Sequence, residues 1–180
     1  MPDAQQAFSA LVDLARRSRA SARGLPAQMD VQTYWSGIGF MLMEHRLVVP
    51  LGEVSEMLEV PPYTHLPGVQ PWVRGVANVR GRLLPIFDMA NFFGGHLSAP
   101  RKQRRVLILE TDELYTGLLV DQVFGIQHFP SDTYREASGP VDSELGAYTV
   151  GCYEHKELGW TVFRPALLAQ DARFINAARG

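Results

Sequence analysis

The sequence contains little cysteine, no long apolar run and no large excess of charge of either sign. Its single cysteine, Cys152, cannot form an internal disulfide, which favours a reducing compartment. The 17 basic and 19 acidic residues give a formal net charge of -2, so no global field attracts nucleic acid or an anionic membrane. No stretch approaches the roughly 20 apolar residues of a membrane span, and Asp3, Asp13 and Arg16 interrupt the start of the chain before a signal-peptide core could form. These absences predict a cytoplasmic protein that does not insert into a membrane.

The common signatures of catalysis and metal binding are also missing from the sequence. It has no G-x-S-x-G, Walker or H-E-x-x-H motif, and its five histidines are scattered without ligand spacing. Cys152 lies between Gly151 and Tyr153 in an apolar run, where a buried thiol is far commoner than a nucleophile. We therefore expect no catalytic residue, no metal and no cofactor.

Two aspartates leave an enzymatic alternative open. Asp88 and Asp121 each close an apolar run, and a pair of carboxylates could perform acid–base chemistry. An aspartate at the end of a strand more often accepts hydrogen bonds from backbone amides of the next turn. We favour that structural role, and the enzymatic alternative requires the two carboxylates to converge in one pocket.

Four segments share one pattern: an apolar run, a short polar turn and a second apolar run, which predicts β-hairpins. They are residues 37–51, 72–89, 104–124 and 147–163. Short strands with connections rich in glycine and proline favour small β-barrels over a sheet built from β-α-β units.

The start of the chain has the pattern of a helix. Its apolar residues recur at helical spacing: Phe8, Leu11, Val12 and Ala15. Asp3 can cap the beginning of this helix, whereas Gly24 and Pro26 end it. We expect residues 1–33 to form a helical extension whose apolar stripe packs on its own domain, with a partner surface as the alternative.

Two more helices and one boundary are expected within the domain at residues 34–178. A short helix is expected after Pro50, in VSEMLEV, and a packed helix in the tail FRPALLAQDARFINAARG. Glycine, proline and basic residues gather at 94–105, which predicts an exposed loop and the boundary between two subdomains.

One residue of the second hairpin is unusual for its position. Asn78-Val79-Arg80-Gly81 fits a tight turn, with Arg80 at the tip and exposed to water. A lone exposed arginine contributes on the order of 0–1 kcal/mol to stability even when it is paired. Guanidinium groups are, in contrast, favoured as anchors of protein interfaces. Arg80 is therefore either a solubilising turn residue or a binding residue.

Basic residues near this turn suggest a second alternative, a β-barrel that binds nucleic acid. Arg74, Arg80 and Arg82 would contact phosphates together with the basic loop at 101–105. No aromatic stacking platform accompanies these residues, so a solvated loop is favoured.

Three stretches resemble the motifs of CheW-type chemotaxis coupling domains. GVANVRGRLLPIFDMANFFG, residues 75–94, resembles the family signature, in which G-V-x-N-L-R-G precedes apolar residues with a proline and then D-L. YTGLLVDQVFGI, residues 115–126, resembles the second motif, and GFMLMEHRLVVPLGEVSEML, residues 39–58, resembles the opening strands. The resemblance covers residues 35–170, and within the family it is strongest to the adaptor of the type IV pilus (twitching motility) chemosensory system.

This resemblance implies an all-β fold with minor helices, in which two small five-stranded SH3-like β-barrels pack on a shared hydrophobic core. It implies a non-enzymatic adaptor without cofactors that couples a methyl-accepting chemoreceptor, at its cytoplasmic tip, to the CheW-like regulatory domain of a CheA-type histidine kinase. Such an adaptor is recruited to receptor arrays at the membrane.

Five residues match positions of the family that contact partners. Arg80 matches the arginine of the signature, and Glu56 matches an acidic position near that arginine. Val54, Arg105 and Ile126 match further interface positions, although apolar residues are usual where Arg105 stands. The resemblance leaves open which of the five face the kinase and which face the receptor.

Overall fold

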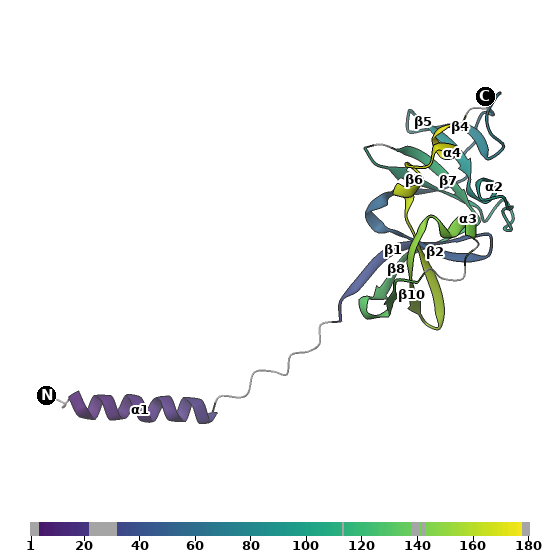
Figure 1. The fold of residues 1–180 in the computed structure, drawn as a ribbon. Helices are drawn as coiled ribbons and strands as arrows, with labels where there is room; N and C mark the ends of the chain where they lie inside the picture. Colours follow the sequence, from purple (N-terminus) through teal and green to yellow (C-terminus); the bar gives the residue numbers. More distant parts are fainter. Residues whose placement is uncertain (1–3, 22–31, 113, 138–140, 142, 178–180) are drawn as a thin grey trace. The chain divides into compact units, whose positions relative to one another are not determined.

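The computed structural model describes residues 4–21, 32–112, 114–137, 141 and 143–177. The chain divides into two compact units, Met1–Gln32 and Thr33–Gly180. The first contains helix α1, Ala4–Ser21, and the second contains both β-sheets (Figure 1). The expected cap at Asp3 and the expected stop at Gly24 and Pro26 lie outside the described residues. Within the described residues, no helix is long and apolar enough to cross a bilayer.

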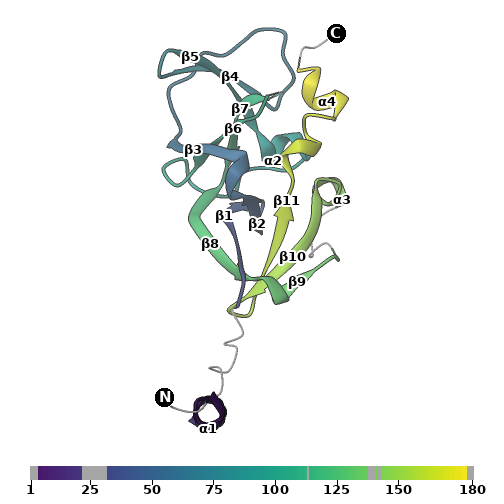
Figure 2. The same ribbon diagram turned by 90° about the vertical axis from the view of Figure 1, so that its left-hand side faces the viewer.

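Two sheets form the second unit, and the second sheet lies above the first in Figures 1 and 2. The first has the order β8-β1-β2-β11-β10-β9, with bounds Gln122–Pro130, Tyr34–Leu42, His45–Pro50, Leu158–Phe163, Thr149–His155 and Tyr134–Arg135. The second has the order β3-β6-β7-β5-β4, with bounds Val54–Glu59, Arg105–Glu110, Tyr115–Val120, Arg82–Asp88 and Val73–Val79. Short helical turns lie between the strands and after the last one: η1 Leu51–Glu53, α2 Met89–Phe92, η2 Ser131–Thr133, α3 Ser143–Gly146, η3 Pro165–Leu167 and α4 Ala172–Ile175.

The predicted hairpins are present as the antiparallel pairs β1–β2, β4–β5, β6–β7 and β10–β11. Three of them have two-residue turns in which both residues have positive φ: Met43-Glu44, Arg80-Gly81 and Lys156-Glu157. This is the type I′ geometry, whose twist matches that of the flanking strands. The fourth turn contains residue 113, which lies outside the described part of the chain.

Three apolar clusters explain why the strands read as unbroken apolar runs. In β2, Leu47 and Val49 pack in a core shared by both sheets, whereas Val48 between them packs in the interior of the first sheet. Strands β6 and β7 alternate in the same way between the shared core and the interior of the second sheet. A strand buried on both faces needs apolar residues at successive positions. The predicted pair of small barrels on a shared core is confirmed, with the two-residue β9 as a sixth strand in the first sheet.

The prediction of a helix after Pro50 is wrong for most of that segment. Only Leu51–Glu53 is helical, and Val54–Glu59 is strand β3, which pairs with β6. Its residues alternate between inward and outward positions, as a period of two requires. Pairing with β3 satisfies the outer backbone groups of β6, and this tertiary pairing outweighs a weak local preference for helix.

The segment at 94–105 is a loop within the second sheet, because the strands before and after it, β5 and β6, both belong to that sheet. The chain passes between the two sheets after β2 and again after β7. The expected helix in the tail is two short turns, Pro165–Leu167 and Ala172–Ile175. Asp171 caps the second turn, and Phe174 fixes it to the shared core.

Candidate functional site

Arg80 occupies the tip of the β4–β5 hairpin in a left-handed conformation. Its φ is 53° and that of Gly81 is 81°, so the turn has two central residues of positive φ. The N–H of Gly81 donates to Oδ1 of Asn78 at 2.9 Å, which closes the turn. Left-handed backbone costs a residue with a Cβ roughly 1–2 kcal/mol. Asparagine or glycine would fit this position at less cost, so turn geometry alone does not account for an arginine here.

The Arg80 side chain is held by Glu56. Nη2 of Arg80 lies 2.7 Å from Oε1 of Glu56, with the Arg80 side chain 78% exposed and the Glu56 side chain 26% exposed. Glu56 lies on β3 and Arg80 follows β4, which are the two edge strands of the second sheet. The ion pair therefore joins the two edges of a curled sheet. An exposed pair adds only about 0–1 kcal/mol, so its main effect is to orient the guanidinium.

A second ion pair joins β5 to β6. Nη1 of Arg82 lies 2.6 Å from Oε1 of Glu110, and its guanidinium carbon lies 3.8 Å from the ring centroid of Tyr115. The hydrogen bond to Glu110 raises the pKa of Arg82. Leu83, the next residue of β5, is a large apolar side chain exposed to solvent. We call Glu56, Arg80, Arg82, Leu83 and Glu110 the hairpin-tip surface.

The sequence alone did not reveal the contacts of Arg82. Glu110 lies 28 positions from Arg82 along the chain. No local pattern marks such a pair, since it depends on β5 and β6 both pairing with β7.

The other three predicted partner-binding residues lie apart from the Arg80–Glu56 contact. Val54 begins β3 and is only 8% exposed, because it packs in the shared core. The guanidinium of Arg105 donates to the carbonyls of Lys102 and Arg104 at 2.8 Å each. Ile126 lies on β8, an edge strand of the first sheet, and is 52% exposed.

Asp88 has a structural environment. Its Oδ1 accepts a hydrogen bond of 3.0 Å from the N–H of Asn91 and thereby caps α2, as expected for an aspartate that closes a strand. Its Oδ2 lies 2.7 Å from Nη2 of Arg74. Both oxygens of this buried carboxylate are therefore engaged by groups of the fold.

Asp121 is engaged by more distant groups than expected. Its Oδ2 accepts from the N–H of Met43 at 2.8 Å, and its Oδ1 accepts from the N–H of Ala99 at 2.7 Å. Neither donor belongs to the turn that follows β7. The two aspartates thus hold backbone segments in place, and this arrangement favours structural roles over acid–base chemistry.

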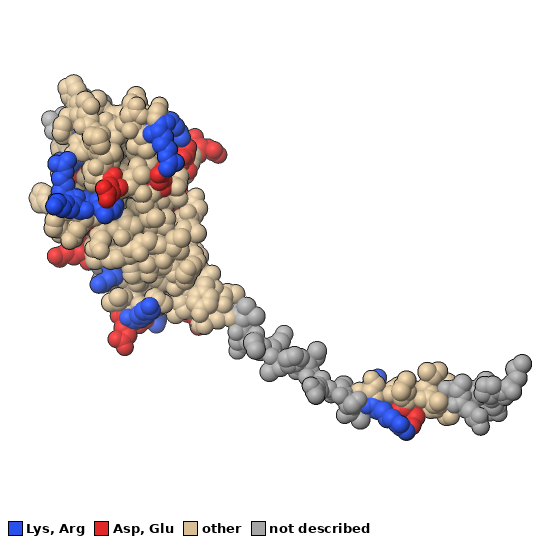
Figure 3. Space-filling view, turned by 180° about the vertical axis from the view of Figure 1, so that it is seen from behind, with Lys and Arg blue, Asp and Glu red and all other residues tan. Residues whose placement is uncertain are grey.

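Carboxylates also neutralise the arginines that the nucleic-acid alternative requires. The pairs are Arg74–Asp88, Arg80–Glu56 and Arg82–Glu110. In the basic loop, Arg104 directs its guanidinium to the carbonyls of Ala99 and Leu97. On the face shown in Figure 3, basic and acidic side chains are interspersed over the domain. A continuous basic track, which phosphate binding needs, is not formed by these described residues.

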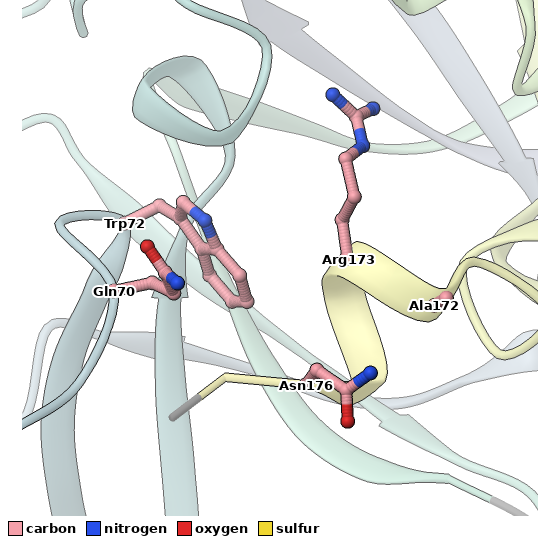
Figure 4. Close-up of a pocket in the computed structure, with 5 residues that line it drawn as sticks. All are labelled: Gln70, Trp72, Ala172, Arg173 and Asn176. Atoms are coloured by element: carbon pink, nitrogen blue, oxygen red, sulfur yellow. The ribbon is translucent and has the colours of Figure 1, made fainter. Parts of the chain in front are cut away.

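A cavity of about 420 Å³ lies between the segment before β4 and the C-terminal turn α4. Figure 4 shows Gln70 and Trp72 across the cavity from Arg173 and Asn176. The guanidinium of Arg173 is engaged elsewhere, with Glu144 at 3.3 Å and the ring centroid of Phe92 at 5.0 Å. The cavity therefore offers two amides and an indole rather than a catalytic group. Among the described residues, no cluster of three or more His, Cys, Asp or Glu side chains could hold a metal ion.

A network beside the cavity fixes the C-terminal turn. The hydroxyl of Tyr148 donates a hydrogen bond to Asp171, and Arg173 donates to the same hydroxyl at 3.2 Å. Burial opposes ionisation of Asp171, but the hydrogen bonds from Tyr148 and from the N–H of Arg173 outweigh it and lower the pKa of this carboxyl. Burial, together with the bond to Asp171, raises the pKa of Tyr148.

The fold and its motifs together define a CheW-like adaptor. A family model described as the CheW-like domain matches residues 36–173, and the chain belongs to this family. Protein PilI of Pseudomonas aeruginosa is 51% identical over 178 residues, which cover 99% of this chain and 99% of that protein. Chemotaxis protein CheW of Helicobacter pylori is 26% identical over 113 residues, 63% of this chain and 68% of that protein.

A solved structure has the same fold. The crystal structure of the scaffolding protein TtCheW from Thermoanaerobacter tengcongensis matches with a TM-score of 0.64 and 22% identity, over 73% of this chain and 90% of that one. The family and the fold predicted from the sequence motifs are therefore confirmed.

Proposed function

We propose that the chain is a non-enzymatic adaptor that holds a CheA-type histidine kinase and a methyl-accepting chemoreceptor together in a type IV pilus chemosensory system that controls twitching motility. Membership of the CheW-like family supports the adaptor role, and 51% identity to PilI over nearly the full length supports the assignment to the pilus system. In this proposal the protein acts in the cytoplasm and reaches membrane-associated arrays through the receptor.

The observation that carries the proposal is the exposed, oriented guanidinium of Arg80 on the hairpin-tip surface. Glu56 fixes its direction at 2.7 Å while most of its side chain stays in contact with water. A planar group with several donors, already oriented, loses little conformational freedom when a partner binds. Leu83, three residues further along the same hairpin, is an exposed apolar side chain that offers area for burial.

The five residues predicted to contact partners divide by position. We infer that Arg80 contacts a partner directly, that Glu56 orients it, and that buried Val54 holds β3 in place beneath them. Ile126, exposed on an edge strand of the first sheet, would contribute to a second contact surface, and Arg105 would shape the loop before β6. Two surfaces on one rigid body raise the avidity of the assembly by ~10²-fold or more, because each bound partner increases the effective concentration of the other.

The test is the affinity of purified Arg80→Glu protein for the cognate kinase, through its CheW-like regulatory domain, and for the cognate receptor tip. We expect at least one dissociation constant to rise about ten-fold or more, since the change reverses the charge of an interface anchor. Arg101→Glu is the matched control, because it makes the same charge change on an exposed residue of the loop at 94–105. If Arg80→Glu unfolds at the same temperature and binds both partners as tightly as the control, the proposed role of Arg80 is wrong.

A further inference from the structure

Helix α1 carries an apolar stripe that no other described residue of its own unit covers. Each of residues 8–19 is exposed, and Phe8 and Leu11 have exposed fractions of 69% and 64%. Helices of up to about 15 residues are marginal in water alone, and amphipathic helices are stabilised mainly by packing of the apolar face. At 18 residues, α1 is only slightly longer than this limit, so a stable helix needs another surface, the occupant of the stripe, to pack on its apolar face.

The extension is additional to the conserved fold of the family. The family model matches residues 36–173 and therefore begins after α1. The alignment with PilI covers 99% of both chains, so that relative has a segment corresponding to the extension. The family model thus gives no indication of what packs on the stripe, because α1 lies outside the residues that it matches.

Size and charge are distributed unevenly along α1. At 100° per residue, Phe8, Leu11, Val12 and Ala15 fall on one face, with the bulkiest side chain toward the N-terminal end and the smallest toward the C-terminal end. Arginines occupy the C-terminal half at positions 16, 17 and 19, and Arg17 pairs with Asp13 at 2.8 Å. Figure 3 shows charged side chains mainly along one flank of the described part of this helix.

We propose that the occupant is α1 of a second copy, paired antiparallel. When Leu11 and Val12 meet at the centre of the pair, Phe8 lies opposite Ala15 of the partner subunit, so a large side chain fills the space beside a small one. The basic half of each helix then faces residues 4–7 of the other, whose sequence AQQA has no charge. A parallel pair would instead place phenylalanine on phenylalanine and arginines beside arginines, which repel one another.

The expected association is weak. Two single helices bury less than the roughly 1,600 Å² of a standard stable interface. Such a contact becomes effective when the copies are already held close together, since a linked second contact is strengthened by effective concentration. The inference does not depend on the proposed kinase or receptor contacts, because self-association is measured on the purified chain alone.

Sedimentation equilibrium of the full chain over a range of concentrations tests the pairing. We expect a reversible monomer–dimer equilibrium whose association constant falls about ten-fold or more in Leu11→Glu, which places a charge in the apolar seam. Ala10→Glu is the matched control, since it adds the same charge to an exposed residue on the opposite face of the helix and should leave the equilibrium unchanged. A chain that stays monomeric at all concentrations, or an equilibrium that Leu11→Glu does not alter, overturns the proposal.

Other occupants of the stripe give distinct outcomes. If the chain is monomeric and Leu11→Glu lowers its unfolding temperature, the stripe packs on its own domain. If the chain is monomeric and Leu11→Glu weakens only kinase or receptor binding, the stripe docks on that partner. Either result rejects self-pairing, and each is distinguishable from failure of the Arg80 test.

Cysteine cross-linking tests the orientation in a Cys152→Ser background. Val12 lies next to the centre of the antiparallel pair, so Val12→Cys should form a disulfide-linked dimer under mild oxidation. Ala15 and Ala15 of the partner subunit are separated by seven residues along the axis, about 10 Å, which a disulfide cannot span. Cross-linking of Ala15→Cys as fast as Val12→Cys would indicate a parallel pair and overturn the antiparallel arrangement.

Discussion

The carboxylate of Asp121 accepts a hydrogen bond of 2.8 Å from the N–H of Met43, a residue 78 positions earlier in the chain. Met43 lies in the β1–β2 turn with a φ of 48°, and Asp121 stands where the chain leaves the second sheet for the first. The other oxygen of Asp121 accepts from Ala99 in the loop at 94–105. One buried side chain therefore connects a turn of the first sheet to a loop of the second.

Replacing Asp121 by asparagine should destabilise the whole domain. An amide has one acceptor oxygen, so its NH₂ group would face one of the two backbone donors that the carboxylate now satisfies. Hydrogen bonds to a charged group contribute about 1.5–3 kcal/mol each, and we expect a loss of about 2–3 kcal/mol in the free energy of unfolding. Urea denaturation measures it, with the exposed Asp132→Asn as control. Equal midpoints for the two variants would show that Asp121 is not the connection described.

Arg80→Asn should separate stability from binding. Asparagine tolerates the left-handed conformation that Arg80 adopts, which recovers part of a cost of about 1–2 kcal/mol. The lost ion pair with Glu56 is exposed and contributes about 0–1 kcal/mol. We therefore expect a free energy of unfolding equal to or above that of the parent, measured in urea, together with weaker binding to the kinase or receptor. A loss of stability beyond about 1 kcal/mol would contradict this account of the turn.

The Tyr148–Asp171 bond predicts a pH dependence. Because the pKa of Asp171 is lowered in the folded protein, its contribution to stability is present above its unfolded pKa and is lost as the pH falls through the folded pKa. Asp171→Asn should thus be less stable than the parent at neutral pH, with the difference shrinking as the pH falls below about 4. Urea denaturation at neutral and acidic pH measures both values. A difference that stays constant between the two would exclude this linkage.

Gly75 should be far less tolerant of a side chain than Gly159. Gly75 has a φ of 142°, and a Cβ built there would lie 2.1 Å from the carbonyl oxygen of Thr64. The backbones of Thr64 and Val76 are hydrogen-bonded to each other, so the carbonyl cannot move away without breaking this bridge. We expect Gly75→Ala to cost about 1–3 kcal/mol by thermal or urea unfolding. Gly159→Ala, where nothing lies within 4 Å, should change stability little.

The fold could be predicted from the sequence where local patterns decide it. Each hairpin has an apolar run on both sides of its turn, and the turn at Arg80-Gly81 occurs where expected. Strand β3 could not be predicted, because VSEMLEV becomes a strand only when β6 lies beside it. The passage between sheets after β7 also lacks a local signal, since the apolar run continues through Asp121 into β8.

The candidate site could be predicted in part. A motif places Arg80 at the tip of a hairpin, and family resemblance places Glu56 near it, as the distance of 2.7 Å confirms. The pair of Arg82 with Glu110 depends on the order of strands in the sheet, and nothing near either residue in the sequence reveals it. The burial of Val54 is another consequence of tertiary packing, since the same sequence on a helix would have placed it differently.

The alternation of side chains along β2 has a mechanical consequence. Leu47 and Val49 are inserted between the two sheets while Val48, on the same backbone, is inserted into the first sheet alone. Close-packed interiors are hardly compressible, so neither sheet can slide or tilt without dragging the other. A displacement of the first sheet at Ile126 is therefore expected to displace the second sheet, which carries Arg80, as well.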